Sequence, residues 1–440
     1  MEKVDTLINA GWVVPVEPDC QARAGWSIAV RNGRVAALGP TQEVGSRYEA
    51  DEVIDRPDHI VVPGFINTHT HAGMSLMRGI ADDLPLMDWL KGHIWPAEQK
   101  WVSPEFVADG TELAIAEMLA SGTTCFADMY FFPDVVARTA ARLGMRACPG
   151  LIAIEFASAW AQDAAEYLSK GLAVRDEYKS HPLISTIFAP HAPYTLSDKS
   201  LLRIRRLSDE LEIPVQIHLH ETGDEITQSI NEHRQRPIAR LEELGLLSPL
   251  LLAVHMTQLE DREIELAAAR GINVAHCPES NMKLASGACP VPRLIESGIN
   301  VAMGTDGAAS NNDLDMIGEM KTAALLAKHE AGSAAVLTAR DVLRMATING
   351  ARALGLAGET GSLVVGKWAD ITCIDLRRIR TQPVFEPVAQ LVYAAGREQV
   401  TDVWVAGRQL VAAGKLTRVD ETDLLQRVSV WNRKLAGQAE

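Results

Sequence analysis

The sequence predicts an α/β protein: a (β/α)8 TIM-like barrel with a small β-sandwich domain formed from both chain termini. Two observations support this prediction. Short apolar runs in the middle of the chain alternate with stretches of helical period, and both ends show the alternating pattern of β-strands. We expect residues 1–63 and 365–440 to form the sandwich domain and residues 64–364 to form the barrel.

Both ends of the chain carry strand patterns. Residues 27–39, SIAVRNGRVAALG, place two apolar runs around Asn32-Gly33, a dipeptide typical of tight β-hairpins. Residues 361–375 and 400–415 alternate in the same manner, with glycines at the expected turns. Because two strand-rich ends flank one long middle segment, they are predicted to pair into a single small domain.

The middle of the chain repeats a strand–helix unit. Its apolar runs are separated by segments of helical period such as 104–121, 198–212 and 259–271. Strands separated by helices of this length form parallel sheets, and eight such units favour a closed barrel. A doubly wound open sheet is the alternative, but no glycine-rich nucleotide loop follows any run. The runs are residues 60–71, 122–129, 145–154, 183–191, 213–221, 250–256, 272–279 and 299–307.

Nearly every apolar run ends in polar residues that a core would not choose. Any one of them alone is more often a hydrogen-bonded core histidine or a capping aspartate. In a parallel barrel, however, the carboxyl ends of all strands open on one face, so these side chains would converge there. Their shared position therefore favours a functional site. The residues are His69, His71, Asp128, His191, His218, His220, Glu221, His255, His276 and Asp306.

These strand-end side chains predict a divalent transition metal. Imidazole nitrogens and carboxylate oxygens are ligands that zinc accepts. Residues i and i+2 of a strand point the same way, so His69 and His71 can reach one ion together. His218 and His220 share that spacing, and only one of them is needed if Asp306 also binds. Three histidines and one aspartate leave a position open for water, as catalytic sites do.

Several separated motifs resemble the amidohydrolase superfamily, over essentially the whole chain. Within it, residues 78–98 and 276–287 resemble the methylthioadenosine/S-adenosylhomocysteine deaminases. The resemblance implies one divalent ion held by His69, His71, His218 and Asp306. We expect zinc, although the same ligands accept iron or manganese. The fourth run ends in IFAPHAP, without the lysine that bridges two metals in one branch of the superfamily, which favours a single ion. The motifs are PGFINTHTH (63–71), HLHET (218–222), VAHCPESNMKLASG (274–287) and MGTDGAASNNDLDM (303–316).

The resemblance also implies the reaction and the roles of the remaining polar residues. The expected activity is hydrolytic deamination of 5'-methylthioadenosine, with S-adenosylhomocysteine, adenosine or 5'-deoxyadenosine as further substrates. Asp306 would take a proton from the attacking water, and His255 would orient that water. Glu221 would protonate the ring nitrogen and later the leaving amine. Glu98 would accept hydrogen bonds from the ribose hydroxyls, and His191 would contact a ring nitrogen or the ribose.

One segment departs from the family pattern. The family contacts its substrate with arginines after the third strand, but residues 152–171 contain none. This absence counts more against a carboxylate-bearing substrate such as S-adenosylhomocysteine than against 5'-methylthioadenosine. Two alternatives stay open: a guanine or oxidised-purine deaminase or triazine hydrolase of the same superfamily, and a non-catalytic metal-stabilised scaffold. The complete ligand set, with Glu221 and His255 beside it, argues against the scaffold.

The composition limits the partners. The 42 basic and 57 acidic residues give a net charge of −15, which argues against nucleic-acid or membrane partners. We expect no transmembrane segment and no export signal, because no apolar stretch reaches transmembrane length and the first residues lack a basic region followed by an apolar one. Its six scattered cysteines predict buried free thiols and a cytoplasmic protein. We expect a small-molecule purine nucleoside substrate and a homo-oligomer, either a dimer or a tetramer.

Overall fold

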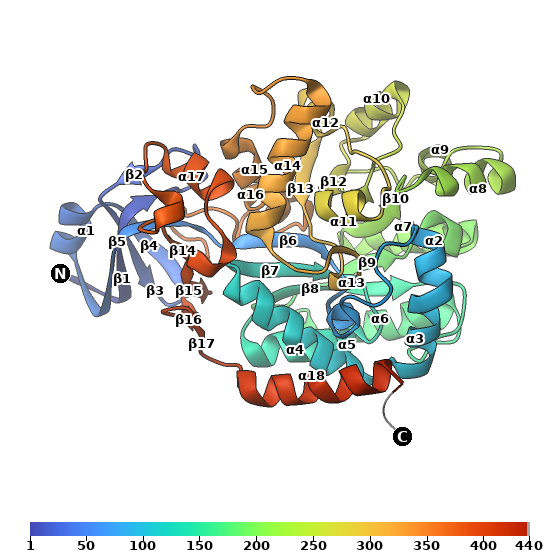
Figure 1. Cartoon of the computed structure of the whole chain (residues 1–440), viewed down its shortest axis with the longest axis horizontal. Helices are drawn as coiled ribbons and strands as arrows, with labels where there is room; N and C mark the ends of the chain where they lie inside the picture. The colour runs from blue at the N-terminus through green and yellow to red at the C-terminus, as the bar shows by residue number, and fades with distance from the viewer. Residues whose placement is uncertain (438–440) are drawn as a thin grey trace.

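A computed structural model describes residues 1–437, and within them the middle of the chain forms an eight-stranded parallel sheet (Figure 1). The strand order follows the chain from β6 to β13. The last strand returns to the first: the Thr68 hydroxyl donates to the Met303 carbonyl (2.9 Å), and the Asp306 N–H donates to the His69 carbonyl (3.0 Å). The predicted barrel is thus confirmed. Its strands are β6 (Phe65–Thr70), β7 (Thr123–Asp128), β8 (Arg146–Ala153), β9 (Ile187–Pro190), β10 (Val215–Leu219), β11 (Leu251–His255), β12 (Asn273–His276) and β13 (Asn300–Met303).

Helices surround the barrel, as the periodicity predicts. The stretches 104–121, 198–212 and 259–271 correspond to α4, α7 and α10. Ser103 and Ser197 cap the first two of these with their hydroxyls, and Gly271 ends the third at a positive φ of 67°. The helices are α4 (Pro104–Ala120), α5 (Pro133–Leu143), α6 (Ala164–Tyr178), α7 (Asp198–Leu211), α8 (Gly223–His233), α9 (Pro237–Glu243), α10 (Asp261–Arg270), α11 (Pro278–Lys283), α12 (Val291–Glu296), α13 (Ala308–Asn311), α14 (Met316–Ala331), α15 (Ala339–Met345) and α16 (Ile348–Ala353).

A long connection between β6 and α4 covers part of the carboxyl end of the barrel. It contains η1 (Ala72–Met77), α2 (Leu86–Trp89), η2 (Leu90–Ile94) and α3 (Trp95–Trp101), and a shorter turn, η3 (Pro193–Thr195), follows β9. The segment η1 packs closely on α4, because a Cβ on Gly110 of that helix would overlap the backbone of Gly73. This contact fixes the chain directly after the first barrel strand.

The two chain ends meet in one mixed sheet, at the left of Figure 1. Within residues 1–437 this sheet has nine strands, and the antiparallel pair β5–β14 joins its N-terminal and C-terminal parts. The hairpin β3–β4 turns at Asn32 and Gly33, whose φ angles of 51° and 75° are those that its turn requires. The division into domains at residues 63/64 and 364/365 stays a prediction. The elements are β1 (Glu2–Val13), β2 (Arg23–Ala24), β3 (Trp26–Arg31), β4 (Arg34–Pro40), α1 (Thr41–Arg47), β5 (Tyr48–Pro63), β14 (Ile371–Asp375), η4 (Ile379–Thr381), α17 (Pro387–Tyr393), η5 (Arg397–Gln399), β15 (Val400–Val405), β16 (Arg408–Ala412) and β17 (Lys415–Leu416).

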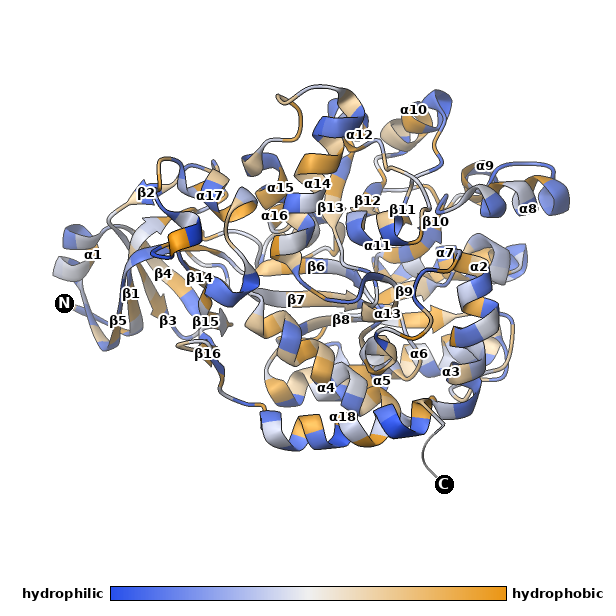
Figure 2. Cartoon of the chain, in the orientation of Figure 1, coloured by the Kyte–Doolittle hydropathy of each residue, from blue (hydrophilic) through white to orange (hydrophobic). Residues whose placement is uncertain are grey.

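The last helix, α18 (Glu421–Leu435), leaves the terminal sheet and lies along α4 (Figure 1). It carries hydrophobic and hydrophilic residues along its length (Figure 2), and its buried residues are Leu424 and Trp431. The Trp431 indole N–H donates to Asp109 of α4 (2.7 Å), and Arg427 pairs with Asp109 and Glu112. The C-terminal helix therefore braces α4, which in turn supports η1.

Two further observations bear on the expectations from composition. All six cysteines, each within the described part of the chain, are buried and free, as predicted. No helix in residues 1–437 combines the length and the apolar character needed to cross a membrane.

Candidate metal centre and active-site pocket

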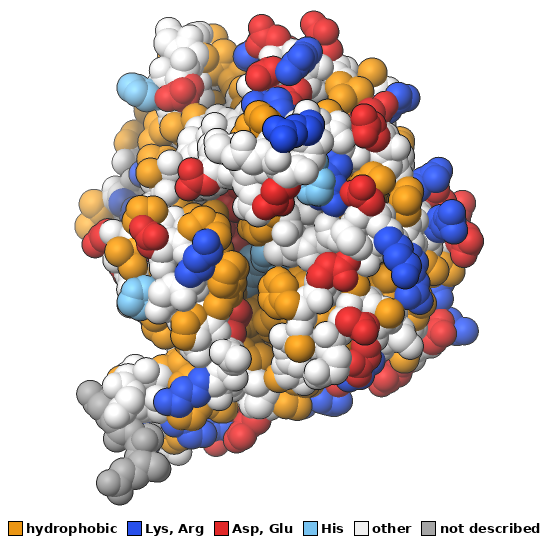
Figure 3. Space-filling model, turned by 90° about the vertical axis from the view of Figure 1, so that its right-hand side faces the viewer, with side chains coloured by type: hydrophobic (Ala, Val, Ile, Leu, Met, Phe, Trp, Pro, Cys, Tyr) orange, Lys and Arg blue, Asp and Glu red, His pale blue; other side chains and the backbone are white. Residues whose placement is uncertain are grey.

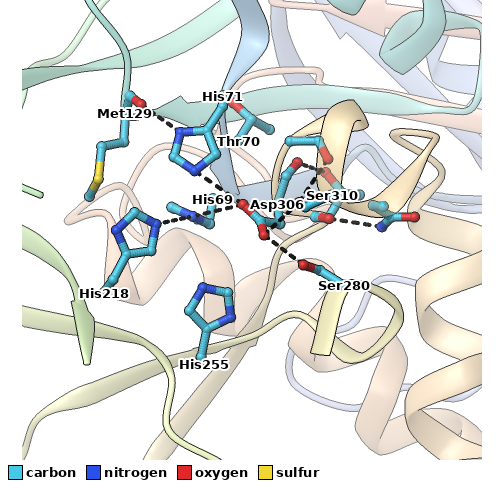
Figure 4. Close-up of polar contacts among 12 residues, drawn as sticks. His69, Thr70, His71, Met129, His218, His255, Ser280, Asp306 and Ser310 are labelled. Atoms are coloured by element: carbon cyan, nitrogen blue, oxygen red, sulfur yellow. Dashed lines mark hydrogen bonds and ion pairs between the residues drawn. The ribbon is translucent and has the colours of Figure 1, made fainter. Parts of the chain in front are cut away.

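The structure brings the four predicted metal ligands together at the carboxyl end of the barrel (Figure 4). His69 lies in β6, His71 directly follows that strand, His218 lies in β10, and Asp306 follows β13. One ligand atom from each residue lies within 4.8 Å of all the others. Asp306 Oδ1 is 3.3 Å from His69 Nε2 and 3.1 Å from His71 Nε2, and the Nε2 atoms of His69 and His218 are 3.1 Å apart.

Backbone carbonyls orient two of these imidazoles. The Nδ1 atom of His71 lies 2.6 Å from the Met129 carbonyl, and that of His218 lies 2.7 Å from the His191 carbonyl. A carbonyl only accepts, so each Nδ1 carries a proton and each Nε2 faces the cluster, where the neutral imidazole offers a lone pair. This is the form in which histidine binds a metal.

Two serines orient the carboxylate. The hydroxyls of Ser280 on α11 and Ser310 on α13 both donate to Asp306 Oδ2, at 2.7 and 2.8 Å. The other oxygen, Oδ1, therefore faces the histidines (Figure 4). Asp306 holds this orientation in the left-handed region of backbone space, with a φ of 62° that few non-glycine residues adopt.

Burial and the Asp306 charge set the protonation of the cluster. Burial lowers the pKa of His69 to about 4 and that of His218 well below its ordinary value, so both imidazoles are neutral. Burial also disfavours the charged form of His71, but the Asp306 carboxylate beside its Nε2 atom outweighs this effect and raises its pKa to about 9, so Asp306 favours a positive charge, either a proton or a metal ion, at this nitrogen. Burial would raise the pKa of Asp306, yet the close Nε2 atoms of His69 and His71 hold it well below the ordinary value.

The arrangement fits a divalent cation. Within residues 1–437 the buried Asp306 Oδ1 atom has no hydrogen-bond partner. A buried charged oxygen without a hydrogen-bond partner is costly. One cation between the four ligand atoms would satisfy all of them, and three nitrogens with one oxygen form a set that zinc accepts.

A pocket opens above this cluster and encloses about 880 Å³ between protein atoms, including its mouth. Figure 3 shows it as a hollow in one face of the molecule, with a histidine inside and hydrophobic side chains around it. The predicted site residues Glu98, His191, Glu221, His255 and Asp306 all line the pocket. The structure therefore brings together most of the polar strand-end residues, whereas Asp128, His220 and His276 do not line the pocket.

Glu221 and His255 lie beside the ligands. His255 ends β11 with a φ of 76°, and its Nε2 atom is 3.9 Å from a carboxylate oxygen of Glu221. Its Nδ1 atom lies 2.8 Å from Asn281 Oδ1, so Nδ1 carries the proton and Nε2 is free to accept one. Burial, and then repulsion from Asp306, raises the pKa of Glu221 to about 8, so this residue is a carboxylic acid at neutral pH.

Glu98 and His191 occupy other parts of the pocket wall. Glu98 lies on α3, and the residue as a whole is partly exposed. Burial of its carboxyl group raises its pKa to about 7, although the nearby Tyr130 hydroxyl acts to lower it. His191 directly follows β9, and burial lowers its pKa to about 3, so its imidazole is neutral. Glu98 can thus accept hydrogen bonds when ionised, and His191 can donate one and accept one.

Other strand-end residues have structural partners. Both nitrogens of His220 are used: Nδ1 lies 3.1 Å from the Gln258 carbonyl, and Nε2 accepts the Ile238 N–H at 3.0 Å. Asp128 accepts the Ala72 N–H at 2.6 Å and so holds the start of η1. These contacts give both His220 and Asp128 structural roles, which leaves His218 as the histidine of its strand that faces the cluster.

The sequence analysis missed three residues that act through others. Ser280 and Ser310 orient Asp306, and Asn281 fixes the tautomer of His255. Ser280 and Asn281 are neighbours in the motif of residues 276–287 and directly follow a predicted strand end. That position was the one available signal, but it does not tell which strand-end residue each of them contacts.

Comparisons with known proteins agree with this geometry. A family model described as the amidohydrolase family matches residues 60–410. The chain is 49% identical over 435 residues to a Teredinibacter turnerae protein named 5-methylthioadenosine/S-adenosylhomocysteine deaminase, and the match covers 99% of this chain and 98% of that one. It is 46% identical to a Saccharophagus degradans protein of the same name, covering 99% and 97% of the two chains.

Solved structures show the same similarity. An adenosine deaminase from Xanthomonas campestris with bound zinc superposes with a TM-score of 0.98 at 49% identity and covers 99% of both chains. Atrazine chlorohydrolase from Arthrobacter aurescens, complexed with zinc, superposes with a TM-score of 0.90 at 22% identity, covering 97% of this chain and 100% of that one. At this lower identity the second match shows a shared fold alone.

Proposed function

The chain belongs to the amidohydrolase family, and on that premise we propose that it hydrolyses the exocyclic amine of 5'-methylthioadenosine and related 5'-modified adenosines. The products are the inosine analogue and ammonia. The observation that carries the proposal is one pocket that holds His69, His71, His218 and Asp306 as a ligand set with protonated Glu221 beside them. Relatives that are 46–49% identical over nearly the whole chain carry the name of this activity.

One divalent ion per chain, zinc by similarity to the zinc-containing deaminase structure, would be held by the four ligands. When bound, such an ion supplies Lewis acidity that lowers the pKa of the attacking water toward neutrality. Asp306 is placed to take a proton from this water, because Ser280 and Ser310 occupy only its Oδ2 atom. His255 accepts a hydrogen bond at Nε2 and aligns the water with the purine ring.

Glu221 handles the protons on the substrate side. Attack at C6 disrupts the aromatic ring unless the adjacent ring nitrogen is protonated, and Glu221 in its acid form supplies that proton. It then takes the hydroxyl proton from the adduct and passes it to the amine, so the C–N bond breaks and ammonia leaves. The proton held by Asp306 restores the acid form of Glu221, and the ring nitrogen keeps its proton in the product.

The nucleoside part of the substrate requires further contacts. We assign the ribose hydroxyls to Glu98 and a ring nitrogen or the ribose to His191, since both residues line the same pocket. A homo-oligomer in the cytoplasm also belongs to this proposal. The exposed side chains of Ile379 and Phe385, which are 100% and 91% accessible, support an oligomer, and light scattering after size-exclusion chromatography tests it.

The test is an ammonia-release screen on zinc-loaded protein with 5'-methylthioadenosine, S-adenosylhomocysteine, adenosine, guanine and melamine. We expect turnover of nucleosides and none of the free bases, and the Glu98→Gln variant should lose at least about tenfold in kcat/KM on nucleosides. Preferred turnover of guanine or melamine would favour the guanine deaminase or triazine hydrolase alternative. No turnover at all, with a chelator lowering stability, would favour the metal-stabilised scaffold.

A further inference from the structure

The outer part of the active-site pocket is apolar. The partly exposed side chains of its lining include Leu90 and Trp95 from the covering connection, and Phe131 and Phe156 from the segments that follow β7 and β8. Among the described residues, no lysine or arginine lines the pocket, whereas Glu98, Glu221 and Asp306 do. An anionic group in this part of the pocket would therefore find no cationic side chain in the lining to pair with.

The depth of the pocket fixes which end of a nucleoside meets this wall. The ligand cluster lies at the bottom, where His69 and Asp306 are at most 5% exposed. Phe156 lies at the rim and is 50% exposed. Reaction at C6 requires the six-membered ring at the bottom, and the 5' carbon lies at the opposite end of a nucleoside. The 5' substituent therefore faces the outer, apolar part.

The lysines next to lining residues in the sequence do not line the pocket themselves. Lys283 precedes the lining residue Leu284 and pairs with Asp82 at 2.7 Å. Lys91 follows Leu90 in η2, but it is exposed and lies outside the lining. A carboxylate that entered the outer pocket would lose water without gaining a partner, which costs free energy.

We propose that this wall selects uncharged 5' substituents, so that the preferred substrates are 5'-methylthioadenosine and other alkylthioadenosines. S-adenosylhomocysteine, which carries a carboxylate and an ammonium group, is then a poor substrate. The inference rests on the proposed deaminase function. A thioether packs well on aromatic and aliphatic side chains, because sulfur is polarizable and its contacts with aromatic rings are favourable. Burial of an alkyl group on the same wall adds hydrophobic free energy.

The experiment compares kcat/KM of the zinc-loaded enzyme for three substrates. These are 5'-methylthioadenosine, 5'-butylthio-5'-deoxyadenosine and S-adenosylhomocysteine, of which the last two have side chains of similar length and differ chiefly in charge. We expect the two alkylthio substrates to agree within about threefold and S-adenosylhomocysteine to be at least about tenfold worse. Equal rates for S-adenosylhomocysteine and the butylthio analogue would overturn the inference. No turnover of any of the three would instead remove the proposed function.

Three charge variants test whether this wall sets the preference for the 5' substituent. Phe156→Arg places a cation at the rim and should raise kcat/KM for S-adenosylhomocysteine relative to the butylthio analogue by about tenfold. Leu325→Arg, which places the same cation at an equally exposed site (50%) on α14 outside the pocket, should leave that ratio unchanged. Lys91→Ala should also leave it unchanged. An unaltered ratio in Phe156→Arg, or a loss of S-adenosylhomocysteine turnover in Lys91→Ala, would show that this wall does not set the preference.

Discussion

The terminal sheet and the carboxyl end of the barrel each bury an aspartate, but the two carboxylates differ in their hydrogen-bond donors. Asp402 of β15 is fully buried, and its oxygens accept from Arg56 Nε and Nη2 at 2.6 and 2.8 Å. They also accept from the Thr401 hydroxyl, the Gln409 amide and the Ala413 N–H. Every donor that this carboxylate needs thus comes from the chain itself.

At the barrel end, only one of the two carboxylate oxygens of Asp306 accepts hydrogen bonds from the described part of the chain. Its Oδ2 atom accepts from two serines, whereas Oδ1 faces the Nε2 atoms of His69 and His71, and within residues 1–437 it has no hydrogen-bond partner. Asp306 and His255 also adopt positive φ angles, a conformation that costs about 1 kcal/mol or more for such residues. The contrast indicates that Asp402 stabilises the sheet, whereas Asp306 leaves one carboxylate oxygen available to bind a metal ion.

The strongest test of this contrast is Asp306→Asn. The amide can still accept from the serines through its oxygen and can donate to an imidazole, so we expect the free energy of unfolding to change by no more than about 1 kcal/mol. Without the charge, the ion is held poorly and the water proton has no acceptor. We expect kcat/KM for 5'-methylthioadenosine to fall by at least about 1,000-fold, with a reduced zinc content by metal analysis. Full activity in this variant would contradict the assigned role.

The reciprocal change is Asp402→Asn in the terminal sheet. Its amide group would face donors at a position where the carboxylate only accepts, and the Arg56 charge would lose its partner. We expect the free energy of unfolding, measured by urea denaturation, to fall by about 2–3 kcal/mol, while kcat of the folded enzyme stays within about twofold. If the Asp402→Asn variant kept its stability and lost its activity, Asp402 would belong to the reaction rather than to the stability of the fold.

The convergence of the strand-end residues could be predicted because it follows from a local pattern. An apolar run that ends in His69 or in His218 is visible in the sequence, and the barrel geometry then brings such ends together. The partnerships that complete the site are not local. Ser280 reaches Asp306 only because α11 packs beside the end of β13, and the two residues are 26 positions apart.

The same limit applies to the helix α18. Its amphipathic pattern shows that one face is buried, but it does not show against which element. The contact of Trp431 with Asp109 spans 322 positions and depends on the path of the chain after the terminal sheet. Pairings of this kind depend on the tertiary structure, so no spacing along the sequence predicts them.

The smallest expected effect is on the pH dependence of activity, which separates residues of the barrel-end site from Asp402 of the terminal sheet. Glu221 must be protonated to act as the acid, and its raised pKa of about 8 keeps it protonated at neutral pH. As the pH rises above about 8, the carboxylate form accumulates, and kcat/KM should fall toward a limit of about tenfold per pH unit. The Asp402→Asn variant should show the same decline, because Asp402 takes no part in the reaction. Glu221→Gln should retain only residual activity, and that activity should not show this decline. If the decline persisted unchanged in Glu221→Gln, another group would be the acid, and Glu221 would join Asp402 as a residue that serves structure rather than proton transfer.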